Sequence, residues 1–176
     1  MKTLILGGVR SGKSRYAEEV ARRSGTPVTV IVTGAAEDEE MAVRIAAHRA
    51  RRPANWRVVE APVALGRAIR QVSTPETVVV VDCLTLWLSN VLALSDTEAP
   101  GREREALKEA LSQAPGPTLL VSNEVGLGIV PVNALARRFI DEAGVLHQQL
   151  AQLCDQVVWM VAGIPTVVKG GRAWAS

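Results

Sequence analysis

The sequence of 176 residues has few cysteines, no long apolar run and little net charge. Its two cysteines, Cys83 and Cys154, form no C-x-x-C pair, which argues against a zinc site or a disulfide framework. No apolar stretch approaches the roughly 18 residues that cross a bilayer, so we expect no membrane span. We expect both cysteines to be reduced thiols in a cytoplasmic protein. The formal net charge of +2 is too small for a general nucleic-acid surface, so no nucleic-acid partner is expected.

The length predicts a single domain over residues 1–176, which is enough chain to bury a sizeable core. Strand-like apolar runs alternate with helical patterns along the chain. This alternation predicts an α/β fold with a mostly parallel central sheet and helices on both faces. The predicted strands cover 3–6, 28–33, 77–81, 118–122 and 157–161. The predicted helices cover 13–24, 37–52 and 102–113, with another opening at Pro62 and a polar loop over 95–101.

Residues 7–14 read Gly-Gly-Val-Arg-Ser-Gly-Lys-Ser and fill the G-x-x-x-x-G-K-[ST] template of a phosphate-binding loop, or P-loop. A short apolar run precedes them and a helical pattern follows, as this motif requires. Backbone N–H groups and the helix N-terminus of such a loop face phosphates. We expect Lys13 to be a solvent-facing ligand of the β- and γ-phosphates and the Ser14 hydroxyl to bind magnesium. The alternative is a glycine-rich turn with a fortuitous lysine.

Four consecutive valines, residues 78–81, end at Asp82. Consecutive β-branched residues favour a central strand, and a carboxylate at its end is typical of a Walker B strand that faces magnesium or its water shell. An aspartate that caps the next turn is the alternative. The presence of a P-loop favours the metal interpretation.

The segment 37–52 has the pattern of a helix that begins acidic and ends basic. His48 lies on its half-apolar face, and Arg44, Arg51 and Arg52 lie about one turn away. Neighbouring guanidinium groups disfavour the protonated imidazole, which makes His48 a candidate neutral nucleophile. The same arginines could bind a triphosphate. A packing histidine and a solvated arginine face stay open on the residues alone.

A third polar cluster, Ser122-Asn123-Glu124, ends the fourth predicted strand and precedes a glycine-rich stretch. Open α/β sheets place ligands at this end of their strands. Glu124 could polarise a substrate hydroxyl or support the metal, or it could cap the next helix. His147 and Lys169 have no physical case for a functional role on the sequence alone.

Together these motifs resemble the bifunctional adenosylcobinamide kinase / adenosylcobinamide-phosphate guanylyltransferase family of cobalamin biosynthesis. The resemblance runs nearly end to end and is more specific than the P-loop, which hosts many unrelated activities. Gly34 replaces a more usual alanine. The residues that carry the resemblance are 7–14 with Arg10 in the loop, Glu40, Met41, Arg44, Ile45, His48, Arg49, Arg52, Pro53, Trp56, 82–87, 122–126, Pro131, Arg137, Asp141, Gly144 and Gln148.

The resemblance implies a P-loop α/β domain that can assemble as a homotrimer and uses magnesium with ATP or GTP. It implies phosphorylation of the aminopropanol hydroxyl of adenosylcobinamide. GTP then transfers GMP to His48, and from there to adenosylcobinamide phosphate. The nucleotide contacts that it implies are Gly8, Val9, Arg10, Ser11, Gly12, Lys13, Ser14, Arg15, Thr33, Gly34, Ala35, Arg49, Ala50, Arg51, Arg52, Glu60 and Asp82.

Two other functions stay open at this point. A monofunctional P-loop kinase of another small metabolite would keep residues 7–14 and Asp82, but would give no reason for the arginines around His48. A nucleotide-binding regulatory protein would hydrolyse its nucleotide slowly and would need no acceptor.

Overall fold

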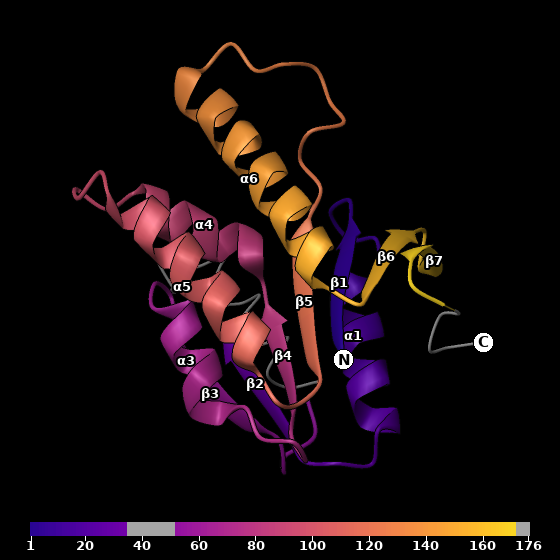
Figure 1. Cartoon of the computed structure of the whole chain (residues 1–176). Helices are drawn as coiled ribbons and strands as arrows, with labels where there is room; N and C mark the ends of the chain where they lie inside the picture. Colours follow the sequence, from indigo (N-terminus) through magenta and orange to yellow (C-terminus); the bar gives the residue numbers. More distant parts are fainter. Residues whose placement is uncertain (35–51, 172–176) are drawn as a thin grey trace.

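The computed structural model describes residues 1–34 and 52–171, and these form a seven-stranded sheet in the order β3-β2-β4-β5-β1-β6-β7 (Figure 1). Neighbouring strands are parallel except for the antiparallel pair β6 and β7. This confirms the predicted α/β fold with a mostly parallel sheet. The strands are β1 (Lys2–Gly7), β2 (Val28–Val32), β3 (Arg57–Glu60), β4 (Val78–Asp82), β5 (Thr118–Asn123), β6 (Gln156–Val161) and β7 (Ile164–Lys169).

The helices cover both faces of this sheet. They are α1 (Lys13–Arg23), α3 (Leu65–Val72), α4 (Leu84–Leu92), α5 (Ala99–Gln113) and α6 (Ala134–Leu153). Helices α3 to α6 share one buried cluster with the sheet, and α1 shares the other. Within the two described ranges, no helix combines the length and apolarity that a membrane crossing needs. Most of the predicted helix 37–52 lies outside the described residues, so that helix stays a prediction.

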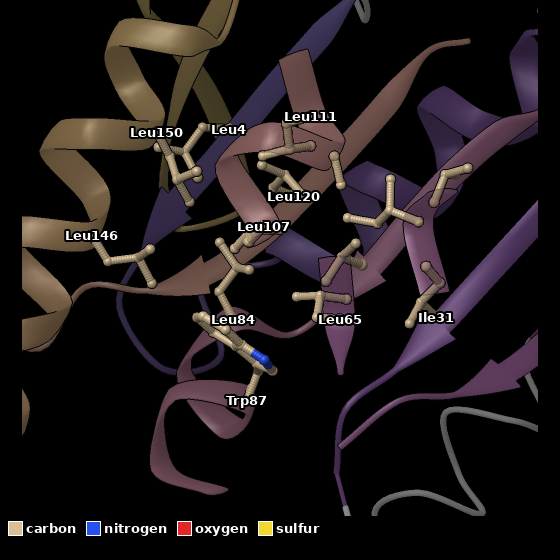
Figure 2. Close-up of a cluster of buried hydrophobic side chains, with 14 of the residues drawn as sticks. Leu4, Ile31, Leu65, Leu84, Trp87, Leu107, Leu111, Leu120, Leu146 and Leu150 are labelled. Atoms are coloured by element: carbon tan, nitrogen blue, oxygen red, sulfur yellow. The ribbon is translucent and has the colours of Figure 1, made fainter. Parts of the chain in front are cut away.

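The valines of β4 explain how one strand serves both clusters. Val79 and Val81 lie in the cluster with α3 to α6, whereas Val78 and Val80 lie in the cluster with α1, because successive strand residues face opposite ways. Figure 2 shows the first cluster, where Leu84 and Trp87 of α4 lie among leucines from the neighbouring helices and the sheet. Each such fully buried large side chain contributes about 1.5–3 kcal/mol to the free energy of unfolding.

The strand order determines which chain ends meet. β5 lies between β1, which leads into the P-loop, and β4, which ends at Asp82. Helix α1 contacts β1, β5 and β4, so it crosses over β5 on its way from the P-loop. Helix α1 therefore packs over β5, and its first turn can reach from the P-loop strand β1 to the end of β4 at Asp82.

Four described elements were not predicted, namely β3, α4, α6 and β7. The sequence pattern explains why three of them, β3, β7 and α4, were missed. β3 and β7 lie at the edges of the sheet and are mostly exposed, so neither shows an apolar run. β7 also contains Pro165, which sheets tolerate mainly at edges. Helix α4 spans only nine residues, six of them apolar, so it shows no clear amphipathic repeat. Helix α5 begins at Ala99, which shortens the predicted loop 95–101.

Helices α3 and α5 approach each other closely at Gly66. A Cβ atom added to Gly66 would lie 2.4 Å from the backbone oxygen of Ala106 and 2.8 Å from the nitrogen of Leu107. Gly101 of α5 is exposed, and an added Cβ there would meet nothing within 4 Å. Replacement by alanine therefore raises the helix propensity at both glycines, but it creates a steric clash only at Gly66.

We expect Gly66→Ala to lower the free energy of unfolding by about 1–3 kcal/mol, because the backbones of α3 and α5 must separate. The control Gly101→Ala should raise it by about 0.5–1 kcal/mol, because only the unfolded chain loses freedom. Urea unfolding measures both. Equal changes for the two variants would contradict the close contact.

Candidate active site

The P-loop is shaped by two glycines and held by the β6–β7 hairpin. Gly12 has a φ of 99°, and Gly7 approaches β6 so closely that an added Cβ would lie 2.5 Å from the Met160 oxygen. The N–H of Gly163, in the β6–β7 turn, donates to the Ser11 oxygen at 2.9 Å. The loop therefore needs glycine at these positions, and the hairpin fixes its place.

Lys13 lies inside the loop that it serves. Its Nζ donates to the Gly8 oxygen at 2.6 Å and to Ser11 Oγ at 3.5 Å, and the residue is only 6% exposed. The expectation of a solvent-facing lysine was wrong, because α1 begins at Lys13 and buries its stem. Burial lowers the pKa of Lys13, and the nearby Asp82 charge offsets part of this effect. A bound phosphate would offset it further.

Ser14 and Asp82 meet at the carboxyl edge of the sheet. Ser14 Oγ donates to Asp82 Oδ1 at 3.1 Å, which joins the first turn of α1 to the end of β4. Hydroxyl and carboxylate oxygens are ligands that magnesium prefers. Across the described ranges, no three His, Cys, Asp or Glu side chains gather in a way that could hold a metal. The pair therefore fits a magnesium ion that is bound jointly by nucleotide phosphates and one carboxylate.

Arg52 bridges two carboxylates beside this pair. Its Nη2 lies 2.8 Å from Asp82 Oδ2, and its Nε lies 3.3 Å from Glu18 Oε1. The Arg52 side chain is 5% exposed and that of Glu18 8%, so water screens this ion pair little. Sequence reasoning placed Arg52 among the phosphate ligands but missed Glu18. The available signal was its spacing, four residues after Ser14 on the same face of α1.

Thr33 joins the ends of β2 and β4 below the site. Its buried hydroxyl donates to the Cys83 oxygen at 2.6 Å and accepts the Cys83 N–H at 2.9 Å. Asn90 Nδ2 donates to the Thr33 oxygen at 2.8 Å. Gly34 follows Thr33 at this edge, and the exposed Glu60 ends the neighbouring strand β3.

The end of β5 is tied to three neighbouring elements. Ser122 Oγ lies 2.7 Å from His147 Nε2 of α6, and Asn123 Nδ2 donates to Thr85 Oγ1 of α4 at 3.1 Å. The Glu124 N–H donates to the Gly7 oxygen at 3.0 Å. Glu124 therefore stands beside the P-loop, and the open alternative that it caps the next helix is wrong, because Asn133 caps α6.

The structure thus gathers part of the predicted site at one edge. It brings together the P-loop residues 8–15, Arg52 and Asp82, with Glu124 from the neighbouring strand end. Thr33, Gly34 and Glu60 lie further along the same edge. Five predicted residues lie outside the described part of the chain, namely Ala35, His48, Arg49, Ala50 and Arg51.

The fold and the site together define a P-loop α/β protein of the NTPase type. A protein from Pyrococcus horikoshii OT3 matches with a TM-score of 0.54 over 97% of this chain and 87% of that chain, at 10% identity. The RadB recombinase matches with a TM-score of 0.51 over 90% of this chain and 73% of that chain, at 18% identity. At these identities the likeness concerns the fold alone.

The sequence comparisons are more specific. The chain belongs to the cobinamide kinase / cobinamide phosphate guanyltransferase family, whose profile matches residues 3–168. It is 53% identical to the bifunctional adenosylcobalamin biosynthesis protein CobP of Pseudomonas aeruginosa, over 97% of this chain and 98% of that protein. It is 38% identical to the bifunctional adenosylcobalamin biosynthesis protein CobU of Escherichia coli K12, over 96% of this chain and 100% of that protein.

Removal of one partner of the buried Glu18–Arg52 contact should destabilise the fold, because the other charge stays buried. We expect Glu18→Gln to lower the free energy of unfolding by about 1–3 kcal/mol, since Arg52 loses one of two charged partners while Asp82 remains. Glu19→Gln is the matched control, because Glu19 pairs with Arg22 and Arg23 on the exposed face of the same helix. It should leave the urea midpoint unchanged. A control variant that destabilises as much as Glu18→Gln would contradict this prediction.

His147 should make stability depend on pH. Burial lowers its pKa below 6.5, against the opposing effect of Glu124, so its contribution is present above that value and is lost as the pH falls. Between about pH 7.5 and pH 5.5 the wild type should lose more free energy of unfolding than His147→Asn, by at most about 1.4 kcal/mol per pH unit. Urea titrations at both pH values provide the measurement, and parallel losses would refute the prediction.

Proposed function

We propose that this chain phosphorylates the aminopropanol hydroxyl of adenosylcobinamide with ATP or GTP. It then transfers GMP from GTP to the phosphorylated product, giving adenosylcobinamide-GDP and pyrophosphate. The family match over residues 3–168 carries this proposal. The bifunctional names of the relatives favour it over a monofunctional kinase or a regulatory protein.

In the kinase step, the acceptor hydroxyl attacks the γ-phosphorus and the bond to the β-phosphate oxygen breaks. Lys13 and the N–H groups of the P-loop would neutralise the phosphates. Ser14 and Asp82 would hold magnesium, which when bound stabilises charge on the phosphate oxygens. Glu124 would accept the hydroxyl proton, and its place beside the P-loop strand supports this role.

In the guanylyl step, the His48 imidazole attacks the α-phosphorus of GTP and pyrophosphate leaves. An oxygen of adenosylcobinamide phosphate then attacks the same phosphorus, and His48 is released. The covalent N–P bond divides the transfer into two displacements. We assign charge stabilisation to Arg44, Arg51 and Arg52, and a nucleotide contact to Arg49. The contact of Arg52 with Asp82 supports the assignment, because it brings one of these arginines beside the P-loop.

The remaining nucleotide contacts are proposed from the resemblance of the sequence to the family. They are Gly8, Val9, Arg10, Ser11, Gly12, Arg15, Thr33, Gly34, Ala35, Ala50 and Glu60. A cytoplasmic location and the absence of a nucleic-acid partner also stay predictions.

The covalent step can be tested without a corrinoid. With GTP and magnesium, we expect the wild type to gain the mass of one GMP and His48→Asn to gain none. His147→Asn is the matched control, because it replaces the other histidine of the chain, and it should still be labelled. His48→Asn should keep the kinase activity, since phosphoryl transfer needs no protein nucleophile, whereas Lys13→Ala should lose it.

A phosphoramidate should be labile in acid and stable in alkali, which distinguishes it from a phosphoserine or an acyl phosphate. Two results would overturn the histidine mechanism. One is a label that survives in His48→Asn, and the other is an equal loss of both activities in a folded His48→Asn protein.

We also infer a homo-oligomer, a trimer by family resemblance. The loop between β5 and α6 supports this proposal, because four of its apolar residues are 74–97% exposed: Leu127, Ile129, Val130 and Val132. Figure 1 shows this loop and the start of α6 extending away from the rest of the fold. Exposed apolar surface of this kind is typical of protein–protein contacts.

Sedimentation velocity tests the assembly. We expect the wild type to sediment as a trimer and Ile129→Asp to sediment as a smaller species, because the charge cannot be buried in the interface without a large desolvation cost. Val168→Asp is the control, since Val168 is 67% exposed on β7. A wild type that is monomeric and active would exclude the trimer.

A further inference from the structure

We propose that His147 is a positioning residue for the kinase step: Ser122 orients its imidazole, and the imidazole in turn orients the Glu124 carboxylate beside the P-loop. This inference rests on the proposed kinase function, because it concerns the group that accepts the hydroxyl proton. It gives a role to a buried histidine for which the sequence offered none.

The side chains of Ser122, His147 and Glu124 form a polar row between α6 and the end of β5. His147 Nε2 lies 2.7 Å from Ser122 Oγ, and His147 Nδ1 lies 3.9 Å from Glu124 Oε2. Ser122 is fully buried and His147 is 7% exposed. The imidazole of α6 therefore spans two residues at the end of one strand, Ser122 and Glu124.

The charge of Glu124 selects the tautomer of this imidazole. A carboxylate beside Nδ1 favours the proton on Nδ1, which leaves Nε2 to accept the Ser122 hydroxyl proton. Burial lowers the pKa of His147, although Glu124 opposes the effect, so the ring is neutral at physiological pH. Because 3.9 Å exceeds hydrogen-bond length, Nδ1–H acts on the carboxylate through its dipole.

Two hydrogen bonds hold Glu124 in place, and His147 orients the carboxylate oxygen that they leave free. Its backbone N–H is fixed to the Gly7 oxygen at 3.0 Å, and its Oε1 accepts the Gly126 N–H at 2.5 Å. His147 faces the second oxygen. The carboxylate is thus held from two sides while its side chain stays 21% exposed, which a proton acceptor for a substrate needs.

A purely structural role gives no reason for this residue type. The neighbouring α6 residues on the same side, Ala143, Leu146 and Leu150, are buried and apolar. An apolar pair in place of Ser122 and His147 would pack there without desolvating polar groups. The polar row is therefore explained better by what it does for Glu124.

Kinetics of the kinase step provide the test, with adenosylcobinamide as acceptor. His147→Leu should lower kcat about 10–100-fold, since a displacement of about 1 Å can cost 10²-fold. The dissociation constant of the nucleotide should stay within about twofold, because Lys13 and Ser14 are unchanged. His147→Asn, which keeps a hydrogen-bonding side chain, should recover most of kcat. Circular dichroism confirms that each variant is folded.

A double-variant cycle separates positioning from independent effects. Glu124→Gln should lower kcat about 10²-fold or more. In that background His147→Leu should add less than about twofold, because residues that act through one another are not additive. If His147→Leu does not fold, Ser122→Ala serves in the same cycle with a smaller loss, since it removes only the hydroxyl that orients the ring.

Nitrogen NMR of the imidazole gives a readout independent of turnover. Nδ1 should be protonated in the wild type, and Glu124→Gln should shift the balance toward protonated Nε2. Two results would overturn the inference and leave the kinase function intact. One is a double variant whose kcat loss equals the product of the losses of Glu124→Gln and His147→Leu. The other is an unchanged kcat in folded His147→Leu. A wild type that fails to phosphorylate adenosylcobinamide would instead overturn the proposed function, and this role of His147 with it.

Discussion

The hydrogen bond between Ser14 and Asp82 is the contact on which the site depends. It links the first turn of α1 to the end of β4, although β5 separates β4 from the P-loop strand β1. Only a helix that crosses over β5 can close this gap, and α1 does so because its apolar face packs on β5 and β4. Burial of that face therefore places a hydroxyl and a carboxylate together, where a nucleotide-bound magnesium needs both.

Charge balance is the second constraint. Lys13 and Arg52 are buried cations, and Glu18 and Asp82 are the carboxylates nearest to them. Buried ion pairs of this kind give little net stability compared with apolar packing, because both partners lose hydration. Their concentration at one edge of the sheet is therefore better explained by ligand binding than by folding. Arg52 also follows His48 by four residues in the sequence, so the described site includes one arginine next to the segment to which the guanylyl step is assigned.

The end of β5 is hydrogen-bonded to α4, α6 and β1. Ser122, Asn123 and Glu124 each form a hydrogen bond to a different one of these elements, so a shift of α4, α6 or β1 would change the position of Glu124. At the C-terminal end of α6, Lys169 of β7 donates to the backbone oxygens of Ala151, Gln152 and Cys154 and so caps the last turn of the helix. Two residues without a role on the sequence alone, His147 and Lys169, thus both anchor the C-terminal half of this helix.

The sequence by itself determined the P-loop, the Asp82 strand and the α/β alternation, because each depends on residues close together in the chain and on short continuous apolar runs. It also carried the family resemblance. Tertiary structure alone decided which strands are neighbours, that Lys13 is buried, and that Glu18 rather than Glu19 faces Arg52. It also decided that His147 lies between Ser122 and Glu124. The contacts of Arg52 with Glu18 and of His147 with Ser122 escape local pattern, because they join residues 34 and 25 positions apart, and identical residue types elsewhere face solvent.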